Sequence, residues 1–197
     1  MKRFFSLWML SVIALTMHAQ KNKAAILYWQ PDYVLQLTDF IIVADDDSKI
    51  KNHNQAITRT GITYSLTSNP ATRSFTVQLY ATMHRKFSYI KKGVLKVAAS
   101  GLENLLSHEQ LHFDISELYA RKAVRALSSK KFSKNYAKEI NLIVQEFFNQ
   151  AKQYQIQYDT ETANGTNKTT QQDWNDRIRK QLQETEQYLN KTVTGIY

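Results

Sequence analysis

The spacing of apolar residues changes once along this chain, and that change restricts its fold more than any other feature. Between residues 24 and 95, apolar and polar side chains tend to alternate, most clearly where Phe75, Val77 and Leu79 share one face. A period of two is typical of strands that bury one face. From residue 97 to 191, apolar residues instead recur every three or four positions, as in amphipathic helices. Strands that all precede the helices predict an α+β domain.

The predicted elements form a mostly antiparallel β-sheet followed by three helices. Strand-like segments occur at 25–29, 33–43, 56–66 and 74–90. The first helix covers 97–127, the second begins after Ser133 and fades near 154–158, and the third covers 171–191. Residues 160–170 are rich in Thr, Asn and Gly, which predicts a loop. None of the 5 Gly belongs to a Gly-rich phosphate-binding loop, so nothing indicates a doubly wound nucleotide-binding fold.

The first 20 residues have the composition of a secretory signal peptide. Lys2 and Arg3 precede an apolar run over 4–17, and polar residues begin at Lys21. A retained membrane anchor is the alternative, but the run is shorter than the roughly 20 apolar residues that cross a bilayer. We therefore predict cleavage after residues 1–20. Residues 21–197 then form a single domain that is secreted or periplasmic and has no transmembrane segment.

The absence of cysteine limits both the cellular compartments in which the protein is expected and the side chains that can bind a metal ion. With 0 Cys in 197 residues, neither a disulfide nor a thiolate metal site can form, and no cysteine is present for lipid attachment. An exported protein without disulfides is more typical of a bacterial envelope than of a eukaryotic secretory route. Any metal ion must be held by His, carboxylate or water.

The chain is basic, with a formal net charge of +9. Such a charge favours acidic surfaces, including anionic lipid headgroups, cell-wall polymers and nucleic acid. The basic residues are scattered, however, and no basic stripe interleaved with aromatic residues is present. We therefore predict a solvated basic surface and no nucleic-acid partner, with an anionic envelope surface as the alternative.

Two histidines and a glutamate in the first predicted helix have the spacing of a zinc-peptidase motif. His108 and His112 are four residues apart, so their imidazoles project from one helix face. Two nitrogens so placed can bind one Zn²⁺, and Glu109 can reach a water on that ion. Zinc lowers the pKa of the water toward about 7, and the carboxylate accepts its proton as the water attacks a carbonyl. We predict His108 and His112 as metal ligands and Glu109 as the catalytic base. The alternative is a surface helix with two exposed histidines.

The third metal ligand is expected from the segment after the second helix. A helix that packs back against the motif would deliver Asp159 or Glu161. Of the other histidines, His53 lies in a polar loop and His84 follows the clearest strand, so both are expected at the surface. Glu117 lies on the far side of the motif helix and is rejected as a ligand.

Four segments of the chain together resemble one protein family. They are His108-Glu109-Gln110-Leu111-His112-Phe113-Asp114-Ile115 with Ala120-Arg121, Tyr158-Asp159-x-x-Thr162-x-x-Gly165, Gln171 with Trp174, and Leu37-Thr38-Asp39-Phe40. This set is similar to the DUF922 family of predicted secreted zinc-dependent proteases, although only the 108–112 block is highly specific. The resemblance implies a zincin-like fold, a Zn²⁺ cofactor and activity on a peptide or protein substrate.

One position departs from the family pattern. The residue before Gly165 is usually His in the family, whereas here it is Asn164, a poor zinc ligand. If that position supplies the third ligand, this chain has lost it; if Asp159 supplies the ligand, the site is intact. We favour Asp159 and predict a zinc-dependent metallopeptidase. The alternative is a catalytically weak or inactive zincin-like scaffold that binds a partner or a cell-wall polymer.

Overall fold

The computed structural model describes residues 24–50, 54–96 and 98–197. The predicted signal peptide at 1–20 and His53 lie outside these residues. The strands are β1 (Ile26–Tyr28), β2 (Ile41–Val43), β3 (Ala56–Ile57), β4 (Thr60–Asn69), β5 (Ser74–His84), β6 (Tyr89–Lys91) and β7 (Thr192–Ile196). The long helices are α2 (Ala99–Ser128), α3 (Tyr136–Glu161) and α4 (Lys168–Glu184). The chain is therefore a mixed α+β protein with an antiparallel sheet before three helices, as predicted.

The strands form two small sheets. In the larger sheet, β5 pairs antiparallel with β4 along one edge and with β1 and β7 along the other. In the smaller sheet the order is β2-β6-β3, where β2 and β6 are parallel and β3 and β6 are antiparallel. The sheets are thus mostly antiparallel, and β3 stands at the end of the smaller one, directly before the long β4.

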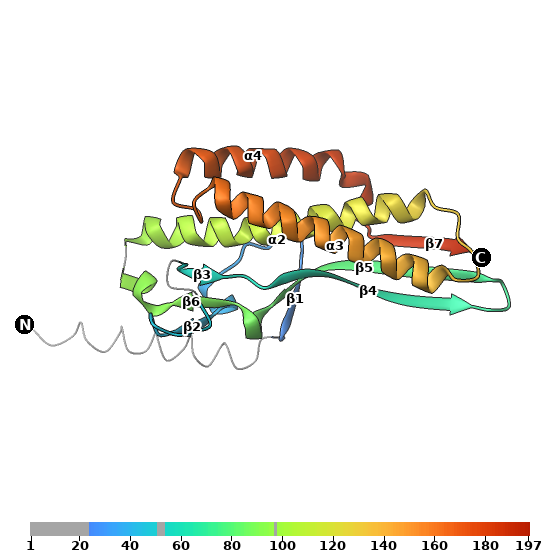
Figure 1. The fold of residues 1–197 in the computed structure, drawn as a ribbon, viewed down its shortest axis with the longest axis horizontal. Coiled ribbons are helices and arrows are strands. Elements are labelled where there is room, and N and C mark those ends of the chain that lie inside the picture. The colour runs from blue at the N-terminus through green and yellow to red at the C-terminus, as the bar shows by residue number, and fades with distance from the viewer. Residues whose placement is uncertain (1–23, 51–53, 97) are drawn as a thin grey trace, which may run out of the picture.

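Helix α2 packs on the strands, α3 crosses it and also contacts β4, and α4 lies on the far side of α2 from the strands (Figure 1). One side of α2 packs on β4 and β5, while α3 and α4 pack on its other sides. Buried apolar side chains accordingly surround it in three clusters. Phe113 and Ala120 cluster with residues of both sheets, Val124 and Leu127 with residues of β5 and α3, and Leu111, Ile115 and Leu118 with residues of α3 and α4. Each large side chain buried in this way contributes roughly 1.5–3 kcal/mol, so α2 is held on every side.

A buried ionic cluster ties α2 to the C-terminal strand. Glu117 is 0% exposed and its Oε1 accepts from Arg121 Nε at 2.8 Å and from Lys191 Nζ at 3.0 Å. Arg121 also donates to the carbonyl of Leu182 at 2.9 Å, just before the end of α4. Glu117 therefore has two structural partners and lies away from the face of α2 that carries His108 and His112, in agreement with its rejection as a ligand.

Several predicted boundaries are wrong for local physical reasons. The predicted strand 33–43 contains a 3-10 turn at Leu37–Asp39, so only Ile41–Val43 forms a paired strand. The predicted strand 74–90 is divided by another 3-10 turn, Arg85–Phe87, and its two parts join different sheets. Helix α3 continues to Glu161 instead of fading near 154–158.

The end of the chain also differs from the prediction of helix to residue 191. Helix α4 begins at Lys168, earlier than expected, because the Asn167 side chain caps it by accepting from Thr170 N. It ends at Glu184, and Thr192–Ile196 then forms β7 beside β5. This short strand was not predicted, since its pairing partner is more than one hundred residues away in sequence.

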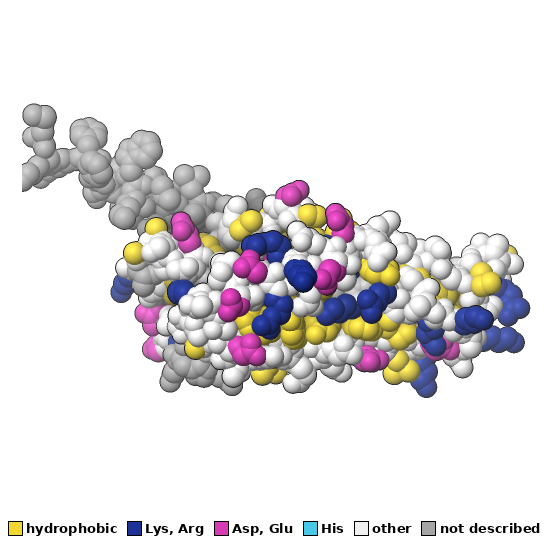
Figure 2. Space-filling model, turned by 90° about the horizontal axis from the view of Figure 1, so that it is seen from above, with side chains coloured by type: hydrophobic (Ala, Val, Ile, Leu, Met, Phe, Trp, Pro, Cys, Tyr) yellow, Lys and Arg dark blue, Asp and Glu magenta, His cyan; other side chains and the backbone are white. Residues whose placement is uncertain are grey.

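Two surface properties complete the description. Within the described ranges, no helix is long and apolar enough to cross a membrane. On the face shown in Figure 2, Lys and Arg side chains stand among acidic and apolar ones. On α4, for example, Arg179 pairs with Asp176 at 2.7 Å.

Candidate metal centre

Helix α2 presents His108 and His112 side by side. They are one turn apart, and their ring centroids are separated by 5.0 Å. Both are buried, at 3% and 9% exposure, where an unpaired imidazole is rare. The flanking apolar residues explain this burial, because Leu111 and Phe113 on either side pack into the cores around α2. The predicted pair is therefore a feature of the interior, and the alternative of two exposed surface histidines is excluded.

Asp159, in the last turn of α3, completes a group of three. Its Oδ1 lies 3.2 Å from His108 Nε2 and 3.0 Å from His112 Nε2. The three ligand atoms are all within 4.8 Å of one another and could hold a metal ion. Oδ1 is buried, yet among the described residues no donor is aligned with it as in a hydrogen bond. Donor atoms at about 2.0–2.1 Å from one tetrahedral ion would stand roughly 3.3 Å apart, close to the two observed distances.

Charge and burial act in opposite directions on this group. Burial alone would raise the pKa of the Asp159 carboxyl, but the adjacent imidazoles of His108 and His112 hold that pKa well below its usual range. Burial alone would lower the pKa of His112, but the carboxylate of Asp159 outweighs it and the net pKa is raised. Asp159 is therefore ionised at neutral pH, in the state required of a ligand.

A glutamine on α4 fixes the ring of His108. Gln171 Oε1 lies 3.0 Å from His108 Nδ1 and accepts from the Tyr158 hydroxyl at 2.8 Å. Gln171 Nε2 donates to Asn175 Oδ1 at 2.9 Å, which orients the amide with its oxygen toward the histidine. An acceptor at Nδ1 favours a proton on that nitrogen, which leaves Nε2, the nitrogen that faces Asp159 and His112, as the one available to a metal ion.

Tyr158 packs against the face of the same imidazole ring. It is fully buried and stacks on His108, with ring centroids 4.6 Å apart and planes inclined by 23°. Burial raises the pKa of its hydroxyl, which donates to Gln171 and lies 3.1 Å from the backbone oxygen of His108. The hydroxyl points into the core, so Tyr158 packs against the histidine and positions it.

A left-handed turn after α3 closes the site. Ala163, Asn164 and Gly165 have φ values of 48°, 53° and 78°. The Thr162 hydroxyl donates to the Tyr158 carbonyl at 2.7 Å and accepts from Gly165 N at 3.2 Å. These bonds hold Gly165 against His108. Thr162 and Gly165 thus help to position the turn beside His108.

Glu109 shares a cavity with the three candidate ligands. The cavity has a volume of about 280 Å³ and is bounded on its other side by residues 54–58, which include β3. Glu109 is 3% exposed, and the Thr58 hydroxyl donates a short hydrogen bond to its Oε2. Thr58 was not predicted; it lies between β3 and β4, and only the packing of these strands on α2 reveals its role. The carboxylate is thus held beside the group without belonging to it.

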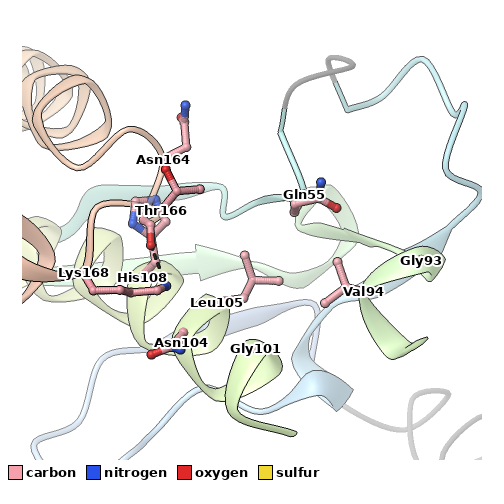
Figure 3. Close-up of a pocket in the computed structure, with 11 residues that line it drawn as sticks. Gln55, Gly93, Val94, Gly101, Asn104, Leu105, His108, Asn164, Thr166 and Lys168 are labelled. Carbon is pink, nitrogen blue, oxygen red and sulfur yellow. Dashed lines mark hydrogen bonds between the residues drawn. The ribbon is translucent and has the colours of Figure 1, made fainter. Parts of the chain in front are cut away.

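Other residues considered from the sequence lie elsewhere. Glu161 accepts from Trp174 Nε1 at 2.8 Å and from Gln157 Nε2 at 2.7 Å, so it faces α4. The ring of His84 lies beside Phe87, with centroids 6.3 Å apart. Asn164 lines the cavity, but its side chain points away from His108 (Figure 3). Of the two acidic candidates, the structure therefore brings only Asp159 to the histidines.

Comparison with known proteins identifies the family of the chain but gives no activity. No curated protein and no solved structure matches the chain. The family model described as "Bacterial protein of unknown function (DUF922)" matches residues 46–168, a segment that includes His108, Glu109, His112 and Asp159. The chain therefore belongs to the DUF922 family.

Proposed function

We propose that this protein is a zinc-dependent metallopeptidase that hydrolyses peptide or amide bonds. One observation carries the proposal: His108, His112 and Asp159 converge within 4.8 Å in a cavity that Glu109 also lines. Predicted export by residues 1–20 would place this activity outside the cytoplasm.

The donor set supports zinc over other metals. Two imidazole nitrogens and one carboxylate oxygen, with no thiolate, match catalytic zinc sites that keep a fourth position for water or substrate. Calcium and magnesium prefer oxygen ligands and larger ligand numbers. The cavity beside the group leaves room for that fourth position. A site with four protein ligands would be structural, whereas three ligands beside an open space favour catalysis.

Glu109 has the location and the support expected of a general base. When bound, zinc supplies a Lewis acid that polarises a carbonyl and lowers the pKa of a coordinated water toward about 7. The Glu109 carboxylate faces the same cavity and accepts a proton there, then returns it to the leaving amine. The Thr58 hydroxyl occupies Oε2, which leaves Oε1 for that proton transfer. The base is therefore oriented before substrate arrives.

The wall formed by residues 54–58 suits a peptide substrate. Strand β3 is at the edge of the smaller sheet, where it pairs with β6 on one side. An extended peptide beside such a strand can form main-chain hydrogen bonds with it. A peptide held there would lie over the metal group, because the same residues line the cavity. This arrangement favours a peptide over a small-molecule amide.

Metal analysis and a cleavage assay on the same samples test the proposal. Purified protein is expected to hold one zinc per chain and to cleave unfolded casein, and chelation should abolish the cleavage. The Glu109→Gln variant should keep its zinc and lose the cleavage, because an amide cannot accept the proton. Glu161→Gln, which changes an acidic residue that faces α4, is the matched control and should keep both.

Three outcomes would contradict the proposal in different ways. Zinc without any cleavage in the unmodified protein would favour the alternative of a binding scaffold. Cleavage that persists in Glu109→Gln at the original rate would show that Glu109 is not the base. Loss of zinc in Glu109→Gln but not in His112→Ala would mean that the ligands are wrongly assigned.

A further inference from the structure

A second cavity adjoins the metal group, and we call it the side pocket. Its volume is about 330 Å³, and it shares Gln55, Leu105, His108, Asn164 and Thr166 with the cavity that holds Glu109. Figure 3 shows it between the N-terminal half of α2, the turn at 164–168 and the segment around Val94. The side pocket would therefore lie directly beside any group bound at the metal.

One face of α2 connects the metal group to the side pocket. Gly101, Leu105 and His108 follow one another at intervals of four and three residues, so they share that face. His112 continues the same line, one turn farther along. The side pocket is therefore aligned with the two histidines along a single helix, and Gly101, which has no side chain, is among its lining residues.

The surface of the side pocket is mostly apolar, although the neutral polar residues Gln55, Asn104, Asn164 and Thr166 also line it. Figure 3 shows Leu105 and Val94 pointing toward the same space. Among the described residues that line it, Lys168 alone carries a full charge, and its Nζ donates to the Gly165 carbonyl at 2.8 Å. No carboxylate is present in this lining to neutralise a basic guest. The volume is at the lower end of the roughly 300–1,000 Å³ of ligand pockets, which suits one side chain.

We propose that the side pocket receives an apolar side chain next to the bond that is cleaved, such as Leu or Phe, and that Lys168 excludes basic residues from it. This substrate preference rests on the proposed peptidase function. An apolar guest would be removed from water against Leu105 and Val94, whereas a Lys or Arg guest would meet the ammonium of Lys168.

Binding of peptide hydroxamates separates this inference from the question of catalysis. A hydroxamate binds zinc directly, so dipeptide hydroxamates that differ in one side chain probe the space beside the metal. With zinc-loaded protein, calorimetry should show the Leu and Phe compounds binding about tenfold or more tightly than the Ala compound, and the Lys compound most weakly. Equal affinities for Ala, Leu and Lys would overturn the proposal.

Variants locate the preference in the side pocket. Gly101→Phe should fill the space and reduce the advantage of Leu over Ala to less than threefold, while plain acetohydroxamate binds as before. Gly101→Ala is the control, since it adds one methyl group and favours the helix. An advantage of Leu that survives Gly101→Phe would assign the preference to another surface.

A charge reversal tests the role of Lys168 independently. Lys168→Glu should strengthen binding of the Lys compound at least tenfold, and its position at the start of α4 suits an acidic residue. Lys180→Glu makes the same change in net charge on the exposed side of α4 and should have no such effect. An unchanged rank order in Lys168→Glu would refute exclusion by Lys168.

The same panel is then offered as cleavable peptides. Preference among hydroxamates without cleavage of any peptide would sink the proposed function and leave the side pocket standing. If all peptides are cleaved at similar rates and all hydroxamates bind with similar affinities, the proposed peptidase function stands and the proposed preference of the side pocket fails. Failure of every hydroxamate, including acetohydroxamate, to bind zinc-loaded protein would overturn both.

Discussion

Gly165 lies directly against the ring of His108. A Cβ atom built on Gly165 would stand 2.9 Å from both Cγ and Nδ1 of that ring, a distance that real Cβ atoms do not show. The ring cannot move aside freely, because Tyr158 stacks on it and Gln171 lies 3.0 Å from its Nδ1. The glycine is thus part of what places a candidate ligand.

Gly165→Ala is expected to weaken metal binding as well as the fold. The left-handed backbone at 165 disfavours Ala by about 1 kcal/mol, and the added methyl group must displace the His108 ring. We expect at least a tenfold loss of zinc affinity in competition titrations and a lower melting temperature. Asn164→Gly is the control, because glycine tolerates the same φ region and Asn164 points away from His108. Loss of zinc affinity in Asn164→Gly instead would make Asn164 a ligand.

Replacing Gln171 tests how the His108 tautomer is maintained. In Gln171→Leu, the His108 Nδ1 proton and the Tyr158 hydroxyl lose their shared acceptor inside the core. Removal of such an outer partner typically lowers metal affinity 10- to 100-fold, and we expect a loss in that range. Gln172→Leu changes the next residue, which is exposed and donates to Asp176 within α4, and should leave affinity unchanged. Equal affinities of the two variants would show that Gln171 does not position the ring.

The local part of the site could be predicted from the sequence, because helix geometry alone fixes it. The four-residue separation of His108 and His112 puts both rings on one side of α2 whatever the tertiary fold. Asp159 and Glu161 were harder to separate. Both are acidic and lie two residues apart, about 200° around a helix, so only one of them can face α2. Which of the two faces the histidines depends on how α3 packs against α2, and the sequence alone does not specify that packing.

The remaining parts depend on contacts between distant segments. Gln171 reaches His108 across 63 residues, and Thr58 reaches Glu109 across 51. Gln171 was noticed in the family signature without a role, and Thr58 carried no signal at all. The strand β7 was missed for the same reason, since its pairing with β5 forms only when the C-terminal segment returns to the sheet. Local sequence patterns therefore predicted most secondary-structure elements, whereas the long-range hydrogen-bond and strand partners are visible only in the folded structure.

The opposed pKa shifts of His112 and Asp159 predict a pH dependence of metal binding. In the metal-free protein the pKa of His112 is raised because the Asp159 carboxylate outweighs burial, so His112 binds a proton more tightly than in the unfolded chain. That stabilisation is fully present below the unfolded pKa of about 6.5 and is lost as pH rises through the folded pKa. Asp159 has the opposite sign: its stabilisation is present above the unfolded pKa of about 3.9 and is lost as pH falls through its lowered pKa.

Zinc must displace the proton on His112, so binding near neutral pH should release protons. Calorimetry in buffers of different ionisation enthalpy measures that release. We expect zinc to raise the melting temperature more at pH 8 than at pH 6, because the metal-free fold loses its proton-linked stabilisation while the metal competes less with protons. Asp159→Asn should reduce the release at neutral pH by removing the charge that raises the pKa of His112. A release that is identical in Asp159→Asn would show that Asp159 does not control the histidine.

The buried cluster around Glu117 predicts a stability defect that is separate from metal binding. Glu117→Gln leaves Arg121 and Lys191 without their shared counter-charge in the interior, and breaking a buried ion pair in this way costs about 3–5 kcal/mol. Denaturant unfolding should show this loss, whereas Glu103→Gln, an exposed change on the same helix, should stay within about 0.5 kcal/mol of the unmodified protein. Zinc stoichiometry of the folded Glu117→Gln protein should remain one per chain, because Glu117 lies on the other side of α2. A variant that keeps full stability but loses zinc would reverse that assignment and make Glu117 part of the metal site.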